Sequence, residues 1–327
     1  MLLLAATAVF GLIIGSFLTV CIFRLPFGRP MGPPDWEVEE EASGETVAIS
    51  SVAANSTAAS LDAAGPEVIG EVVSAAHEEP TADSLSSDPK LSLTYPTRSF
   101  CPECKAQLNW FHNIPLFSWL ALGGKCAFCR VRIPFRYPLV ELLSALFAAL
   151  SFVAFGPTLT AVCVYLFCCM LIVISFIDID YYIIPDVISL PGCVLGLIFG
   201  VVNQFTGVLG WPFASGMVDS LLGLVFGGGV LWAIAEGYYR IRKREGLGLG
   251  DVKLLALTGA FFGLPGALYT MFIGSLLGSV IGILLILASG KRMTYQLPFG
   301  PYLALGTLVY IFAAPLGPPW MGLSLFP

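Results

Sequence analysis

Long apolar runs separated by short polar connections dominate the pattern of this sequence. About 20 consecutive apolar residues are enough for an α-helix to cross the hydrocarbon core of a bilayer. About eight segments approach this length, at residues 2–23, 138–155, 159–177, 187–206, 216–239, 252–269, 271–289 and 297–314. The pattern predicts an all-α polytopic membrane protein in the lipid bilayer, and Gly263-Leu-Pro-Gly266 is placed to end the sixth segment early.

Basic residues fall on one side of this eight-span arrangement. They occur between Arg24 and Arg136, in Arg240-Ile-Arg-Lys-Arg244 and at Lys291-Arg292, whereas the connections near 156, 210 and 265 have none. The positive-inside rule places the basic side in the cytoplasm, so both termini are expected to face outward. The first segment lacks the positive n-region of a signal peptide and is expected to remain as a helix.

Composition separates one region from the rest of the chain. The whole chain is 57% hydrophobic and 12% charged, against roughly 25% charged in ordinary soluble domains. Residues 35–90 hold thirteen acidic residues and one Lys, whereas the remainder of the chain has fifteen basic and nine acidic residues. The insert is therefore the reason that the net charge of the whole chain is negative, at -6. Rich in Ala, Ser, Glu and Pro, the insert is expected to be a disordered linker. The alternative is a partner-docking tail.

Four cysteines form two C-x-x-C pairs, Cys101-Pro-Glu-Cys104 and Cys126-Ala-Phe-Cys129. Two such pairs are the usual ligand set of a structural, tetrahedral zinc ion. A redox or disulfide pair is the alternative, which a reducing cytosol disfavours. His112 lies between the pairs and is expected to pack rather than to bind the metal. The pattern divides the chain into a first helix (1–23), a cytoplasmic region (24–136) with a small zinc-stapled domain (97–136), and a membrane domain (137–327).

Carboxylates stand at the ends of predicted membrane helices at Asp178 with Asp180, and at Asp251. Ionisable groups at membrane helices are costly and therefore indicate function. An aspartyl protease needs two carboxylates that share one proton. Asp178 and Asp180 are about 200° apart on a helix, so only one of them can face Asp251. Helix N-capping is the alternative role for Asp251, and it is the expected role of Asp186.

The residues around Asp251 favour a site that accepts a peptide. Gly248 and Gly250 let the backbone approach a substrate strand closely. Together with Asp180 and Lys253 they are expected to support the site. Two other classes remain open, a transporter whose aspartates bind cations and a non-enzymatic, zinc-stabilised secretion assembly factor. No convincing repeat relates residues 138–210 to 216–314, as a transporter would require.

Several motifs together resemble the prepilin peptidases, also called type IV leader peptidases, in the bifunctional form with a tetracysteine loop. Besides the cysteine pairs, the motifs that carry the resemblance are Gly15-Ser-Phe-Leu-Thr-Val-Cys-Ile-Phe-Arg-Leu-Pro26, Asn113-Ile-Pro-Leu-Phe-Ser-Trp119, Gly124-Lys-Cys126, Arg136-Tyr-Pro-Leu-Val-Glu141, Phe176-Ile-Asp-Ile-Asp-Tyr-Tyr-Ile-Ile-Pro-Asp186 and Gly248-Leu-Gly-Asp-Val-Lys253.

This resemblance implies an aspartyl endopeptidase of the bacterial inner membrane, with its active site facing the cytoplasm. Its substrates would be prepilin or pseudopilin precursors of type IV pili and type II secretion. The family's first catalytic aspartate stands seven residues before the motif's proline, which selects Asp178, and its second is Asp251. N-methylation of the new terminus with S-adenosylmethionine is also implied. The chain departs from the usual pattern of this family at Thr19, where the family usually has Asn, and in the insert at residues 35–90. Both departures bear on methylation. No nucleic-acid partner is expected, and the oligomeric state is not predicted.

Overall fold

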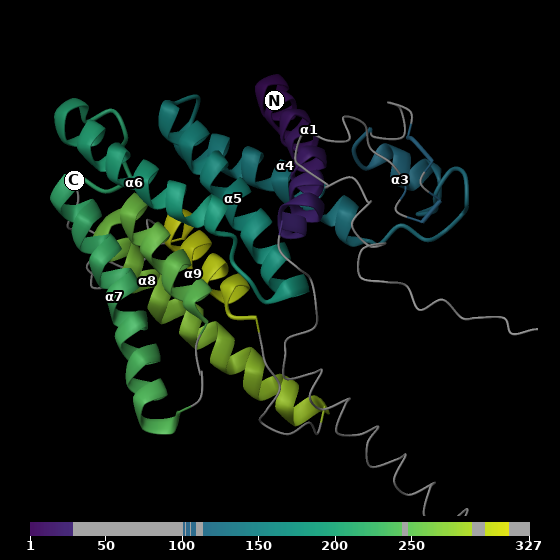
Figure 1. Cartoon of the computed structure of the whole chain (residues 1–327). Helices are drawn as coiled ribbons and strands as arrows, with labels where there is room; N and C mark the ends of the chain where they lie inside the picture. The colour runs from purple at the N-terminus through teal and green to yellow at the C-terminus, as the bar shows by residue number, and fades with distance from the viewer. Residues whose placement is uncertain are drawn as a thin grey trace, which may run out of the picture. The chain divides into compact units, whose positions relative to one another are not determined.

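A computed structural model describes residues 1–28, 101, 103–104, 106–108, 114–243, 248–289 and 298–313. The insert at 35–90 and His112 lie outside the described residues. The chain divides into two compact units, and α1 and α3 to α9 belong to the unit formed by Met1–Pro26 and Leu93–Pro327. The described helices are α1 (Leu2–Arg24), η1 (Leu25–Gly28), α3 (Phe117–Ala121), α4 (Arg136–Phe155), α5 (Leu159–Tyr181), α6 (Asp186–Thr206), α7 (Met217–Arg242), α8 (Leu249–Ser289) and α9 (Gly300–Phe312), as Figure 1 shows.

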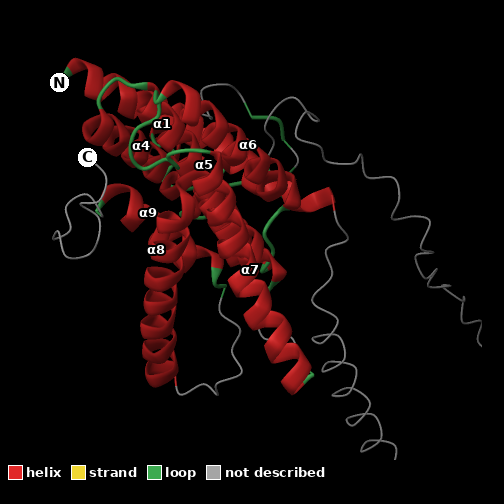
Figure 2. Cartoon of the chain, turned by 90° about the vertical axis from the view of Figure 1, so that its left-hand side faces the viewer, coloured by secondary structure: helices red, strands yellow, loops and turns green. Residues whose placement is uncertain are grey.

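The expected all-α, multi-pass architecture is confirmed, since the described residues contain helices and no strand (Figure 2). Lys125 and Arg132 form an isolated antiparallel bridge. Six helices are long and apolar enough to cross a membrane: α1, α4, α5, α6, α7 and α8. The predicted count of eight spans is not confirmed by this criterion. Two predicted segments lie in α8, and the eighth forms α9, which has 13 residues.

The 41-residue α8 consists of two helical pieces that meet at Gly263. The backbone there has φ 70° and ψ -170°, a conformation that favours glycine, and Pro265 follows within the next turn. The break therefore falls within the predicted motif. The helix resumes after it without an intervening loop, which is why two predicted segments appear as one element.

Helix α5 forms the centre of the packing. One face contributes Val164, Phe167, Leu171 and Ile174 to a core shared with α8 and α9, whereas Ile172 and Ile177 pack with α1 and α4. The ring of Phe167 lies 4.9 Å from that of Phe261 and 4.6 Å from that of Phe262, both edge to face. Lipid is as apolar as these side chains, so close packing rather than escape from water stabilises the assembly.

Small residues let neighbouring helices approach closely. Gly11 and Gly15 of α1 face α4, and Gly223 of α7 faces Gly259 of α8. A Cβ atom at Gly223 or Gly259 would overlap the backbone of the facing helix. Such small-residue contacts are a common basis of helix association in membranes.

Gly259→Val is expected to lower the free energy of unfolding by about 3 kcal/mol, because the added side chain has no space against α7. Gly229→Val on α7 is the control, since nothing lies within 4 Å of a Cβ atom at that position. SDS-induced unfolding followed by circular dichroism measures both. Equal unfolding midpoints for the two variants would contradict the close α7–α8 contact.

Candidate active site

Two aspartates from separate helices come together at the end of α5. Asp178 lies near the C-terminal end of α5 and Asp251 in the first turn of α8. Both are buried, with 5% and 8% of their surface exposed, and they lie close enough for the charge of Asp178 to act on Asp251. The structure thus places the two predicted carboxylates in one site, although 72 residues separate them in the sequence.

The start of α9 completes this site. The backbone N–H of Gly300 donates a hydrogen bond to Oδ2 of Asp178 at 2.9 Å. A Cβ atom on residue 300 would lie 2.7 Å from the same oxygen, so only glycine permits this bond without displacement. Sequence reasoning missed Gly300. The signal was present in Pro298-Phe-Gly-Pro301, which opens the last apolar segment.

Asp180 takes a different direction from Asp178. Its Oδ2 atom lies 2.5 Å from Nη1 of Arg136, at the start of α4. Asp178 is buried whereas Asp180 is exposed, as their angular separation on the helix predicted. Asp180 therefore joins α4 to α5 and does not accompany Asp178 and Asp251.

Neither Asp186 nor Asp251 occupies the helix N-cap position. Pro185 caps α6 and Asp186 is the first helical residue, while Asp251 is the third residue of α8. The N-cap prediction for Asp186 is therefore wrong by one position. A carboxylate in the first turn still interacts favourably with the positive end of the helix dipole. Asp186 also accepts a hydrogen bond from Nζ of Lys253 at 2.5 Å.

The predicted glycines bring the start of α8 close to its neighbours. A Cβ atom at Gly250 would lie 3.1 Å from Cβ of Ile184, in the short connection between α5 and α6. The carbonyl oxygen of Gly248 accepts a hydrogen bond from the N–H of Asp251 at 3.2 Å. Gly250 thus permits the close packing of α8 against the connection that follows Asp178, and Gly248 begins the turn that carries Asp251.

The four predicted cysteine ligands form one cluster. All four Sγ atoms lie within 4.8 Å of one another, and those of Cys101 and Cys129 are 3.8 Å apart. With Zn–S distances of about 2.3 Å, a tetrahedral site separates its sulfur atoms by about 3.8 Å. Hydrogen bonds from the backbone of Cys129 and Phe128 lower the pKa of Cys126, whereas the pKa of Cys129, which shares hydrogen bonds with the other three thiols, is raised. Cys126 is therefore the thiol of this interacting pair that loses its proton first. The cluster can hold a metal ion.

Glu141 of α4 links the membrane helices to the polypeptide of the cysteine region. Its Oε2 atom accepts a hydrogen bond from the backbone N–H of Leu116 at 2.7 Å. Glu141 is only 9% exposed, and Leu116 has a left-handed backbone with φ 57°. This link was not predicted, although Glu141 ends one of the motifs that carry the resemblance.

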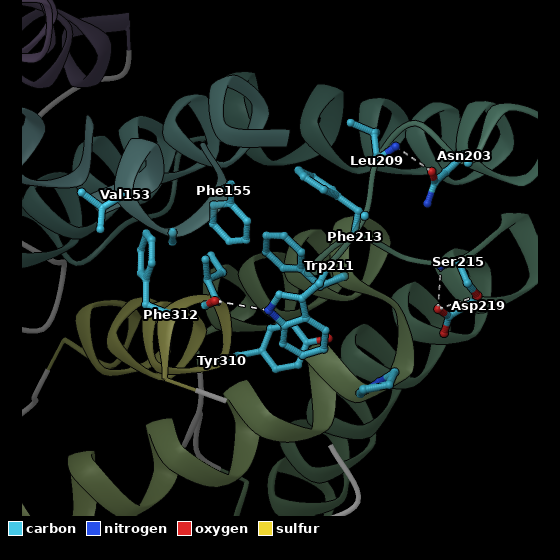
Figure 3. Close-up of a pocket in the computed structure, with 16 residues that line it drawn as sticks. Val153, Phe155, Asn203, Leu209, Trp211, Phe213, Ser215, Asp219, Tyr310 and Phe312 are labelled. Atoms are coloured by element: carbon cyan, nitrogen blue, oxygen red, sulfur yellow. Dashed lines mark hydrogen bonds between the residues drawn. The ribbon is translucent and has the colours of Figure 1, made fainter. Parts of the chain in front are cut away.

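A separate cavity of about 950 Å³ lies near the C-terminal ends of α4 and α9, where Phe155 and Phe312 line it (Figure 3). Aromatic side chains including Trp211, Phe213 and Tyr310 line it. Among the described residues that line it, only Asp219 carries a carboxylate. This carboxylate accepts hydrogen bonds from the backbone N–H of Ser215 and of Leu264, each at 3.1 Å. A single carboxylate engaged in this way does not provide the pair that aspartyl hydrolysis needs, so the cavity is not the candidate active site.

The multi-pass helical fold and two buried carboxylates from separate helices are the features expected of a membrane aspartyl peptidase. Two family comparisons agree with this class: residues 9–155 match the Bacterial Peptidase A24 N-terminal domain, and residues 165–283 match the Type IV leader peptidase family. The chain belongs to the type IV leader peptidase family. The resemblance found in its motifs is therefore confirmed.

Similar proteins cover nearly the whole chain. A protein of Aeromonas salmonicida (strain A449) is 33% identical over 90% of this chain and 86% of its own length. A protein of Pseudomonas aeruginosa is 35% identical over 91% and 86%, and one of Xanthomonas campestris pv. campestris is 33% identical over 94% and 90%. Each of the three is named prepilin leader peptidase/N-methyltransferase. No solved structure matches the chain.

Proposed function

We propose that this protein removes the leader of type IV prepilin-like precursors at the cytoplasmic face of the bacterial inner membrane, with Asp178 and Asp251 as its catalytic pair. The observation that carries the proposal is the approach of these two buried carboxylates from α5 and α8. Prepilin and pseudopilin precursors are the proposed substrates because the relatives are named prepilin leader peptidases.

In the proposed mechanism the two carboxylates share one proton. The ionised carboxylate takes a proton from a water molecule, which attacks the scissile carbonyl carbon, while the protonated one donates a hydrogen bond to the carbonyl oxygen. The C–N bond then breaks as a carboxyl group returns a proton to the leaving amine. The N–H of Gly300 holds the carboxylate of Asp178 in place. Gly248, where a Cβ atom would contact only Asp251 and Gly250, leaves room for the substrate backbone.

We also propose that Cys101, Cys104, Cys126 and Cys129 hold a structural zinc ion. Their sulfur atoms have the spacing of a tetrahedral site. When bound, zinc would tie together segments on both sides of α3. Four thiolates leave no open coordination position, so the ion is assigned no part in cleavage. Residues 97–136 would form this zinc domain, between the first helix and the membrane domain at 137–327.

Methylation of the new N-terminus is the proposed second activity. It is supported by the names of the relatives, which include N-methyltransferase. S-Adenosylmethionine is the proposed methyl donor, and we assign no residue of this chain to it. The basic residues at the cytoplasmic ends support the proposed orientation, because Arg24 ends α1 and Arg240 and Arg242 lie in the last turn of α7.

The test of the function uses the purified protein in lipid nanodiscs with a pilin-like precursor and S-adenosylmethionine. Mass spectrometry is expected to show the precursor without its leader, and the mature product with one added methyl group. The same precursor with its cleavage site altered is the control. Uptake of a cation into proteoliposomes, with the precursor left intact, would instead support the transporter class.

A further inference from the structure

An ion pair outside the proposed catalytic pair joins α8, the helix that carries Asp251, to α6. Nζ of Lys253 in α8 lies 2.5 Å from Oδ1 of Asp186 in α6. The two side chains are 33% and 35% exposed, so the pair is partly shielded from water. Lys253 follows Asp251 by two residues in the same helix, so its backbone moves with that of Asp251.

Asp186, the partner of Lys253 in this ion pair, is linked to Asp178 by the short connection between α5 and α6. Helix α5 ends at Tyr181, and α6 begins at Asp186. The N–H of Tyr182, which follows α5, donates to the carbonyl oxygen of Asp178 at 2.9 Å. Within this connection Ile184 is buried, and it packs against Gly250 at the start of α8. The ion pair therefore holds the start of α8 against the start of α6, and the Ile184–Gly250 contact holds it against the connection that follows α5.

We propose that Lys253 and Asp186 are positioning residues, and that their ion pair fixes the separation of the Asp178 and Asp251 carboxylates. This inference rests on the proposed function. Partly exposed ion pairs contribute little to folding stability, whereas misplacing a reacting group by about 1 Å can cost about 100-fold in rate. The pair therefore acts chiefly on the rate of cleavage and only weakly on stability.

Steady-state cleavage of a pilin-like precursor in nanodiscs tests the proposal. Lys253→Met and Asp186→Asn are each expected to lower kcat about 10- to 100-fold, with KM changed less than about threefold. The double variant is expected to be no slower than the slower single variant, because each change breaks the same pair. Lys253→Arg keeps the charge and is expected to retain most of kcat.

Arg240→Met is the matched control, because Arg240 pairs at 2.7 Å with Glu236 on the surface of α7, within one helix. It is expected to leave kcat unchanged. Unfolding in SDS distinguishes a purely structural role of the ion pair from a positioning role. A purely structural role would lower the stability of the variants and leave kcat per folded molecule at the wild-type value. If Lys253→Met fails to insert, the nearly isosteric Asp186→Asn decides the matter.

A failure of the proposed function and a failure of the positioning role give different results. Absence of cleavage by the wild-type protein, or cleavage by Asp251→Asn, would overturn the proposed function itself. If the wild type cleaves and Asp251→Asn does not, wild-type kcat in Asp186→Asn would overturn the positioning role alone. Multiplicative effects of the two single changes in the double variant would also overturn it, since independent residues do not share one interaction.

Discussion

Asp178→Asn and Asp251→Asn should each reduce precursor cleavage by at least about a thousandfold, because residues that act as one catalytic unit fail together. An amide can neither take the proton from water nor return it to the leaving amine. Membrane insertion should be unaffected, since the change removes a charge from an apolar segment. Initial cleavage rates of the purified variants in nanodiscs, at equal protein concentration, measure the loss.

The matched control is Asp180→Asn, which makes the same chemical change two residues further along α5. Asp180 pairs with Arg136 and lies on a different face of the helix from Asp178, so measurable activity should remain. The double variant Asp178→Asn with Asp251→Asn should be no less active than either single variant. Full activity in Asp178→Asn, or complete loss confined to Asp180→Asn, would remove Asp178 from the proposed pair.

Cys101→Ser and Cys129→Ser should reduce bound zinc from about one ion per chain to a small fraction, because each removes one of four ligands. Metal binding and local folding are linked, so the segment from Cys101 to Ile133 should also become sensitive to proteolysis. Cleavage is expected to survive in part, since the aspartates lie on α5 and α8. Elemental analysis and limited proteolysis provide the two measurements.

Cys163→Ser is the control for this experiment, since Cys163 belongs to α5 and lies outside the cysteine cluster. It should leave the zinc content unchanged. Wild-type protein that is purified without metal, with four titratable thiols in the cluster and the same protease resistance as the zinc-loaded form, would show that the cluster has another role.

Local sequence determined the kind of element at most positions of the membrane domain. Apolar length alone predicted the segments that became α1 and α4 to α7, because a helix satisfies its own backbone hydrogen bonds and needs no distant partner. The break at Gly263 was also predictable, since its causes, glycine and a nearby proline, are local. The cysteine spacing predicted the cluster of four cysteines for the same reason, because the cysteines occur in two short pairs.

Tertiary structure alone decided which distant groups meet. Helical periodicity placed Asp178 and Asp180 on different faces of the helix. Only the packing of the helices brought Asp178 near Asp251 and within hydrogen-bonding distance of the N–H of Gly300. The Lys253–Asp186 and Leu116–Glu141 contacts were likewise absent from any local pattern. The periodicity of a helix specifies the face on which a side chain lies, whereas the neighbour of that face depends on how helices far apart in the chain pack together.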